Sequence, residues 1–179
     1  MTSLRARLAA QGLYFRNALE RPELLSPTIH TSLAAVTSTA LVAPIRDEES
    51  DTAAFFQRFH LEPNLGANCV IVEGRRGETR QLAACVALGA DRMDLNGAVR
   101  KALDARRIRI APADALALLG MEAGGVSPFG LPADWPILVD IAVAGAAELI
   151  IGSGIRASKL LVEGAAIAGI PGARILELT

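Results

Sequence analysis

The sequence predicts a single domain of the α/β (α+β) class, with a mixed β-sheet surrounded by helices. Strand-like and helix-like segments follow one another without the regular βαβ alternation of a parallel sheet. Segment 79–88 is apolar on both faces, which is typical of a central strand covered from both sides. With 51% hydrophobic and 21% charged residues, the composition of the 179-residue chain is globular and excludes general disorder.

The first part of the chain, residues 1–38, is predicted to form a helical extension that packs on a core domain, residues 39–179. Four of its apolar residues recur at helical spacing: Leu4, Leu8, Phe15 and Leu19. This spacing predicts a helix over 3–20 that ends before Pro22. A second helix is expected over 28–38.

The core domain is expected to begin with a strand, a short helix and a hairpin. Segment 40–45 is apolar and contains a proline, which places this strand at a sheet edge or at a strand end. Asp51 is a suitable N-cap for a helix that runs to Phe59. Segments 69–73 and 79–88 resemble strands and are joined by Gly-Arg-Arg-Gly, so they predict a β-hairpin.

A helix, a strand and a second helix are expected next. Asp94 is a suitable N-cap for a helix over 94–104, whose apolar residues share one face. Charged and apolar residues alternate over 106–110, which indicates a strand with one face in water. Pro112 opens another helix at a tolerated first-turn position, and Gly120 ends it.

The C-terminal part combines apolar strands with short connections. The predicted strands, in chain order, are 136–140, 148–151, 158–162 and 173–178. The small residues 142–146 are expected to form a connection, and a short helix is expected over 164–168.

The segment 124–132, here called the Gly-Pro loop, reads Gly-Gly-Val-Ser-Pro-Phe-Gly-Leu-Pro. This many glycines and prolines exclude a helix or a central strand and permit close approach of another backbone or a ligand. We interpret the loop as the lip of a pocket; a rigid turn is the open alternative. Asp140, at the end of the following apolar strand, is expected either to fix the loop or to orient a water or a substrate amine.

Charge and cysteine content restrict the possible functions. The net charge of −1 gives no bulk positive field, so a nucleic-acid partner needs a local basic patch. One basic cluster, either a phosphate-binding patch or a solvated surface, consists of Arg100, Lys101, Arg106, Arg107 and Arg109. Cys69 and Cys85 lie in apolar segments and are expected to be buried free thiols. Without metal-ligand spacing, a signal segment or a membrane-length apolar tract, we expect a soluble cytoplasmic protein with no metal or cofactor.

Two common catalytic or cofactor patterns do not fit. Gly152 and Gly154 follow a strand, but Arg156 and Ala157 stand where the third glycine of a dinucleotide-binding motif belongs. The two histidines lie far upstream in helix-like segments, so a Ser-His-Asp triad is not expected.

The Gly-Pro loop, followed by Pro-Ile-Leu-Val-Asp at 136–140, resembles the signature of YbaK-type aminoacyl-tRNA editing domains, also called prolyl-tRNA-synthetase-associated domains. The similarity spans about residues 40–178 and continues in Met93-Asp94-Leu95, in the strand from Arg107 to Arg109 and in Gly-Ser-Gly at 152–154. It implies a mixed, barrel-like sheet and hydrolysis of the ester that joins a wrong amino acid to tRNA. The implied partners are aminoacyl-tRNA and an aminoacyl-tRNA synthetase.

The resemblance also implies roles for individual residues. Gly124 and Gly125 would let main-chain groups approach the amine and ester of the substrate, while Ser127 and Asp140 would hold the loop or a water. With backbone amides facing the developing oxyanion, no covalent nucleophile is required. The residues expected to bind the amino acid or the tRNA are Asn68, Val126, Pro128, Phe129, Gly130, Gly152, Ser153, Gly154, Lys159, Arg107 and Arg109.

One position departs from the family pattern. The lysine that commonly begins the strand after the first helix is Asn68 here, which can hydrogen-bond but carries no charge. Lys159, just after the Gly-Ser-Gly turn, is hypothesised to supply that charge from another strand. The alternative function is a non-catalytic relative that binds tRNA or a synthetase after losing the lysine.

Overall fold

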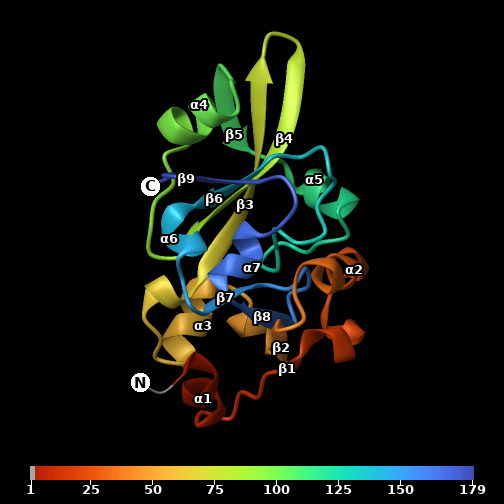
Figure 1. Ribbon diagram of the computed structural model, residues 1–179, viewed down its shortest axis with the longest axis vertical. Helices are drawn as coiled ribbons and strands as arrows, with labels where there is room; N and C mark the ends of the chain where they lie inside the picture. Colours follow the sequence, from red (N-terminus) through yellow and green to blue (C-terminus); the bar gives the residue numbers. More distant parts are fainter. Residues whose placement is uncertain (1–2) are drawn as a thin grey trace.

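The computed structural model describes residues 3–179 as nine strands and a set of short helices (Figure 1). The strands are β1 (Arg16–Asn17), β2 (Leu41–Pro44), β3 (Ala67–Arg76), β4 (Thr79–Leu88), β5 (Arg107–Ile110), β6 (Ile137–Asp140), β7 (Leu149–Gly152), β8 (Ser158–Val162) and β9 (Ala173–Leu176). The α-helices are α1 (Leu4–Ala9), α2 (Pro27–Val36), α3 (Thr52–Arg58), α4 (Arg100–Ala102), α5 (Ala113–Leu118), α6 (Ile141–Ala144) and α7 (Gly164–Ala168). Short 3₁₀ turns are η1 (Ala18–Glu20), η2 (Pro22–Leu24), η3 (Asp47–Glu49) and η4 (Pro63–Leu65), and η5 (Leu95–Val99) is a π-helical turn.

The strands form two sheets. The first has the order β1-β2-β8-β7 and is antiparallel throughout. The second has the order β5-β3-β4-β6-β9 and is mixed, because β6 runs parallel to both of its neighbours. A bridge between Gly66 and Ile150 connects the start of β3 with β7. The predicted mixed α/β class is therefore confirmed, and the strands divide between two sheets where the resemblance implied one barrel-like sheet.

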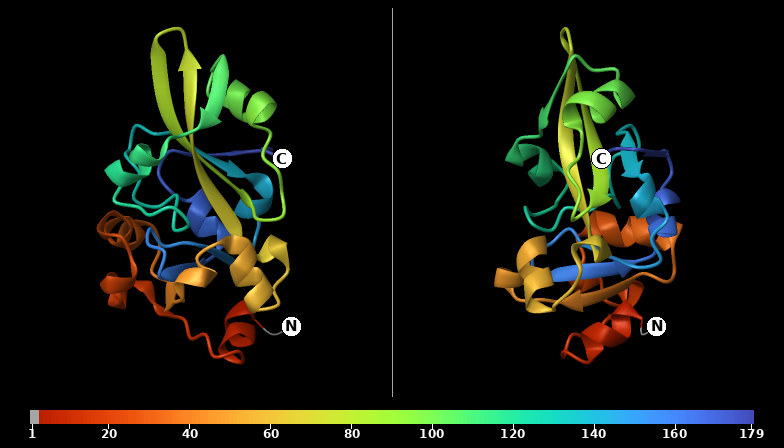
Figure 2. Two further views of the ribbon diagram at one scale, coloured as in Figure 1. Left: turned by 180° about the vertical axis from the view of Figure 1, so that it is seen from behind. Right: turned by 90° about the vertical axis from the view of Figure 1, so that its left-hand side faces the viewer.

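The predicted hairpin is confirmed and is longer than expected. Strands β3 and β4 pair in register from Ala67 opposite Leu88 to Arg76 opposite Thr79. Its tip extends beyond the helices in both views of Figure 2. Strand β4 lies between β3 and β6, and its residues 83–87 are buried, so the apolar pattern on both faces identified a central strand correctly.

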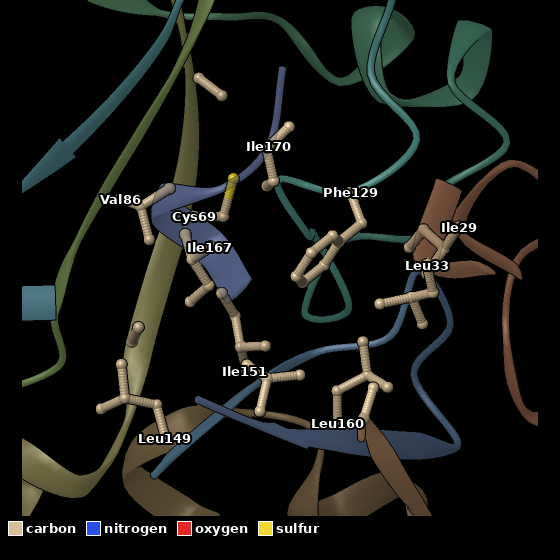
Figure 3. Packing of buried hydrophobic residues seen from close by; sticks show 14 of the residues in the cluster. Ile29, Leu33, Cys69, Val86, Phe129, Leu149, Ile151, Leu160, Ile167 and Ile170 are labelled. Carbon is tan, nitrogen blue, oxygen red and sulfur yellow. The ribbon is translucent and has the colours of Figure 1, made fainter. Parts of the chain in front are cut away.

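The main hydrophobic core lies between the two sheets and the helices α2 and α7. Figure 3 shows Ile29 and Leu33 of α2 and Phe129 of the Gly-Pro loop directed toward Leu160 and Ile151 of the first sheet. Phe129 is fully buried in this cluster. The loop is therefore anchored by an apolar side chain, which stabilises one conformation of its backbone.

The predicted helix over 3–20 is wrong. Helix α1 ends at Ala9, the chain turns at Gly12 with φ of +86°, and Arg16–Asn17 then pairs with β2. This extended path lets Leu13 and Phe15 enter the cluster that α1 forms with α3. The apolar residues of this segment have helical spacing, but a short helix, a turn and a strand bury them instead of one long helix.

Other predicted elements differ mainly at their ends. The segment after Asp94 begins as the π-helical turn η5 before the short α4, and the small residues near 142 form α6 where a connection was expected. Strand β9 ends at Leu176. Both cysteines are free and buried, and burial raises the pKa of both thiols, that of Cys85 to about 12. None of the helices within residues 3–179 is long and apolar enough to cross a membrane.

Candidate functional site

A cavity of about 860 Å³ opens between α3, the first residues of β3 and the first sheet. Its apolar wall includes Phe56, Cys69 and Val126, while Asn68 and Lys159 bring polar groups to it. A cavity of this size, mostly apolar with a few polar groups, has the usual character of a small-molecule site. It is called the central cavity below.

The buried ammonium group in the central cavity belongs to Lys159. This residue lies on β8, opposite Ala43 and Gly152, and is only 3% exposed. Its Nζ donates to the carbonyl oxygen of Ser50 at 2.5 Å and to that of Gly124 at 3.2 Å. Burial lowers the pKa of Lys159 to about 8, which the nearby carboxylate of Asp51 partly opposes. A cation is therefore held at the cavity wall by two carbonyl dipoles, without a salt bridge among the described residues.

The Gly-Pro loop reaches the central cavity through its first residues, Gly124 and Val126. Gly125 packs so closely on the 155 backbone that an added Cβ would lie 2.6 Å from the carbonyl oxygen of Ile155. The amide of Gly154 also donates to the carbonyl oxygen of Gly125 at 2.6 Å. The glycines let the backbones of the Gly-Pro loop and the Gly-Ser-Gly turn lie side by side. Gly152 belongs to this contact as well, because an added Cβ there would collide with the backbone of Gly125 and Val126.

The later residues of the loop face the core instead of the cavity. Phe129 is fully buried in the hydrophobic core, and Pro128 is buried too. At Gly130, φ is +76° and an added Cβ would lie 2.6 Å from the backbone of Thr28 on α2. Ser127 is also buried, and its hydroxyl oxygen has no hydrogen-bond partner among the described residues. The structure thus separates this set from the cavity-lining residues Gly124 and Val126.

The Gly-Ser-Gly turn is held together by its own side chain. The Ser153 hydroxyl lies 2.6 Å from that of Ser158, and the carbonyl oxygens of Ile155 and Ser158 are also within hydrogen-bond distance of it, at 3.2 and 3.0 Å. Of the three turn residues, Gly152 lines the central cavity. Ser153 and Gly154 are buried beneath it, where they shape the backbone that contacts Gly125.

Asn68 occupies the cavity wall from the opposite sheet. It lies on β3, and its side-chain oxygen accepts a hydrogen bond from the Thr52 hydroxyl at 2.8 Å. Neither amide hydrogen of Asn68 has an acceptor within residues 3–179, so both are available to donate to a ligand. Lys159 and Asn68 therefore line one cavity from two sheets.

Asp140 lies elsewhere, which corrects the expectation that it fixes the Gly-Pro loop or orients a water. It is 2% exposed, and its two oxygens accept hydrogen bonds from the amides of Ala142 and Leu178, both at 2.8 Å. These bonds cap α6 and fasten the C-terminal segment to β6. The physical reason is the strand's position: β6 lies between β4 and β9, and none of its residues lines the central cavity.

The arginines of β5 also lie apart from the central cavity. Arg109 donates through two nitrogens to the carboxylate of Glu73, at 3.0 and 3.1 Å, and Arg75 and Arg80 bind the same carboxylate. Together, with Arg109 first, they lower the pKa of Glu73 to about 2. Arg109 is thus an ion-pair partner of a buried acid. Arg107, two residues earlier on β5 and opposite Arg75 of β3, is exposed.

Three contributors to the site were not predicted from the sequence. The Ser50 carbonyl binds Lys159, and Thr52 orients Asn68. Arg156 joins the walls, because its guanidinium donates to Asp47 at 2.9 Å and to the carbonyl of Ala123 at 3.1 Å. Of the three, only Arg156 had a local clue, as a charged residue two positions after the Gly-Ser-Gly turn. Within residues 3–179, no three His, Cys, Asp or Glu side chains come together to hold a metal ion.

Comparison with known proteins adds a family match and structural relatives. The model of the aminoacyl-tRNA editing domain matches residues 47–170. A proposed trans-editing enzyme for prolyl-tRNA synthetase has a TM-score of 0.72 at 19% identity, covering 87% of this chain and 98% of its own. A hypothetical protein has a TM-score of 0.73 at 18% identity, covering 84% and 98%.

A third solved structure, a scaffold protein used for epitope backbone grafting, has a TM-score of 0.71 at 20% identity, covering 87% of this chain and 99% of its own. At these identities the solved structures show a shared fold alone. None of the curated proteins is a significant match.

Proposed function

We propose that this chain, which belongs to the aminoacyl-tRNA editing domain family, hydrolyses the ester bond of mischarged aminoacyl-tRNA in the central cavity. The observation that carries this proposal is the buried ammonium of Lys159, bonded to the Gly124 carbonyl within a cavity that two glycine-rich segments line. An ammonium group in such a site stabilises negative charge more strongly than it does in water.

The proposed reaction is the addition of water to the ester carbonyl carbon. The C–O π electrons move to the carbonyl oxygen, which becomes an oxyanion facing Lys159 and the side-chain amide of Asn68. The tetrahedral intermediate then collapses, the bond to the ribose oxygen breaks, and that oxygen takes up the proton released by the attacking water. The products are a free amino acid and uncharged tRNA. Because these donors are held by other groups before substrate binds, they need little reorganisation during the reaction.

Selection of the amino acid is assigned to the inner wall of the central cavity. Gly152 and Val126 stand next to each other there, and Phe56 covers another side. A fixed wall discriminates by size, and one methylene group in such a pocket is worth about 1–3 kcal/mol. Gly125, Ser127, Pro128, Phe129, Gly130, Ser153 and Gly154 are proposed to hold this wall in place from behind.

The tRNA body and further partners are also part of the proposal. Arg107 is exposed on β5 and is proposed to contact tRNA phosphates, while the proposed role of Arg109 is to position the β5 surface through Glu73. Residues 1–38 are proposed as an extension on the core domain 39–179 that is available to an aminoacyl-tRNA synthetase. These assignments are separate from the chemistry in the central cavity.

A second candidate function is binding of aminoacyl-tRNA without hydrolysis. The observation that favours it is Asn68, a neutral residue at the position where the family commonly has a lysine. A panel of aminoacyl-tRNAs, each carrying a labelled amino acid, separates the two functions. Release of at least one amino acid above the spontaneous rate supports the hydrolase; tight binding with spontaneous release throughout supports the binding protein.

A further inference from the structure

A second hollow, of about 300 Å³, adjoins the central cavity. Asn68 and Val70 of β3 line both, so the two hollows share one wall. The second hollow continues along Leu88 and the segment 91–95 to Ile110 at the end of β5. It is called the Arg92 groove below, defined by Asn68, Val70, Leu88, Asp91, Arg92, Met93, Leu95 and Ile110.

The Arg92 groove combines exposed apolar surface with an available cation. Ile110 is 58% exposed, and Val70 and Met93, which line the same hollow, are only partly buried. Arg92 is exposed and forms no ion pair with another residue of the described chain, 3–179. The nearby Asp94 carboxylate is already occupied, since it accepts from the amides of Gly97 and Ala98.

We propose that the Arg92 groove binds the single-stranded 3′ end of tRNA, at the nucleotides that precede the terminal adenosine. This inference rests on the proposed function, because an ester bound in the central cavity carries its polynucleotide out past the shared wall at Asn68 and Val70. The guanidinium of Arg92 binds a phosphate, and the exposed apolar side chains cover the face of a base.

Asp91 provides an internal control for this assignment. Its carboxylate lines the same groove beside Arg92 and opposes a phosphate there. Arg92→Ala therefore weakens binding of the polynucleotide, whereas Asp91→Asn strengthens it. Neither change touches the central cavity, so hydrolysis of a short substrate without phosphates, aminoacyl-adenosine, is unchanged in both variants.

The test measures kcat and KM of the wild type, Arg92→Ala and Asp91→Asn with aminoacyl-tRNA and with aminoacyl-adenosine. For Arg92→Ala we expect KM for aminoacyl-tRNA to rise by about three- to tenfold, with kcat unchanged and aminoacyl-adenosine hydrolysed as by the wild type. The salt dependence of the affinity should also fall by about 0.7 in log–log slope, as for one lost phosphate contact on a single strand. Arg16→Ala, an exposed arginine of β1 in the other sheet, is the matched control.

Two results would overturn the inference. One is an Arg92→Ala variant with the same KM as the wild type for aminoacyl-tRNA; the other is an equal loss on both substrates, which would place Arg92 in the chemistry or the fold. If the wild type hydrolyses neither substrate, the proposed function fails, and the groove is tested separately by fluorescence anisotropy with a short single-stranded RNA that ends in adenosine. A weaker affinity of Arg92→Ala than of the wild type then upholds the groove, and an equal or higher affinity refutes it.

Discussion

The ammonium nitrogen of Lys159 and the carbonyl oxygen of Gly124 lie 3.2 Å apart, which joins β8 to the first residue of the Gly-Pro loop. The same nitrogen donates to the Ser50 carbonyl at 2.5 Å, next to the N-terminus of α3. One buried cation thus connects three segments that are distant in sequence and surround the central cavity. Its charge is costly to bury, so its presence there calls for a functional reason.

The first prediction concerns stability against pH. The pKa of Lys159 is lowered from 10.5 to about 8 in the folded protein, so between these pH values the unfolded chain binds more protons. Lys159 should therefore contribute a rise in the free energy of unfolding with pH across this range, of up to about 3 kcal/mol. The raised pKa values of Cys69 and Cys85 act in the opposite direction in every variant, so this contribution is measured as the difference between wild type and Lys159→Met in urea denaturation at pH 7 to 10. The difference should grow with pH, whereas the difference between wild type and the exposed Lys101→Met should stay constant; a Lys159→Met difference that does not change with pH would contradict the assignment.

The second prediction concerns the backbone contact of the Gly-Pro loop. Gly125→Ala places a Cβ 2.6 Å from the carbonyl oxygen of Ile155, and this overpacking should lower the free energy of unfolding by about 1–3 kcal/mol. It should also displace the loop and reduce hydrolysis. Gly145→Ala is the matched control, because its Cβ would be 3.5 Å from the nearest oxygen. Equal stability of the two variants would show that the close contact is unimportant.

The third prediction separates Asp140 from the chemistry. Asp140→Ala removes the acceptor for the amides of Ala142 and Leu178, and should lower the free energy of unfolding by about 2–4 kcal/mol. The folded variant should keep the kcat of the wild type at a temperature well below its midpoint of unfolding. A loss of kcat in fully folded protein would return Asp140 to the catalytic residues.

The fourth prediction concerns acid stability at the hairpin. Arg109, Arg80 and Arg75 lower the pKa of Glu73 from 4.5 to about 2, so the stabilisation is complete above pH 4.5 and is lost as pH falls toward 2. Glu73→Gln should lower the urea midpoint at pH 6 and flatten its dependence on pH between 2 and 4.5. Glu78→Gln, at the exposed hairpin tip, should change neither quantity. A wild-type slope retained in Glu73→Gln would assign the acid sensitivity to another group.

Much of the fold could be predicted because burial leaves a local pattern in the sequence. Strand β4 carries apolar residues on both faces, which predicted a central strand. The short polar turn between β3 and β4 predicted their hairpin. The prediction of one long first helix was wrong because the spacing of Leu4 and Phe15 fits both a helix and a chain that turns at Gly12. Only the partner surface, contributed by α3 far along the chain, distinguishes the two.

The candidate site was harder to predict, because side-chain partners depend on strand register and topology. Arg109 and Glu73 face each other through the pairing of β5 with β3, which no local pattern encodes. The partners of Asp140 lie on α6 and near the C-terminus, so its loop-fixing role could not be tested from sequence. Lys159 was proposed for a chemical reason, as a charge just after the Gly-Ser-Gly turn. It lines the same cavity as Asn68, and its role as a replacement for the missing lysine stays a prediction.

The most direct test of the central claim is the single-turnover rate of deacylation of the best substrate from the aminoacyl-tRNA panel. With wild-type protein the rate should exceed spontaneous hydrolysis, and Lys159→Gln should lower it by about 100-fold or more, as for loss of one oxyanion donor. Arg16→Gln, at an exposed residue of β1 that does not line the central cavity, should retain the wild-type rate. A folded Lys159→Gln variant that deacylates as fast as the wild type would contradict the claim.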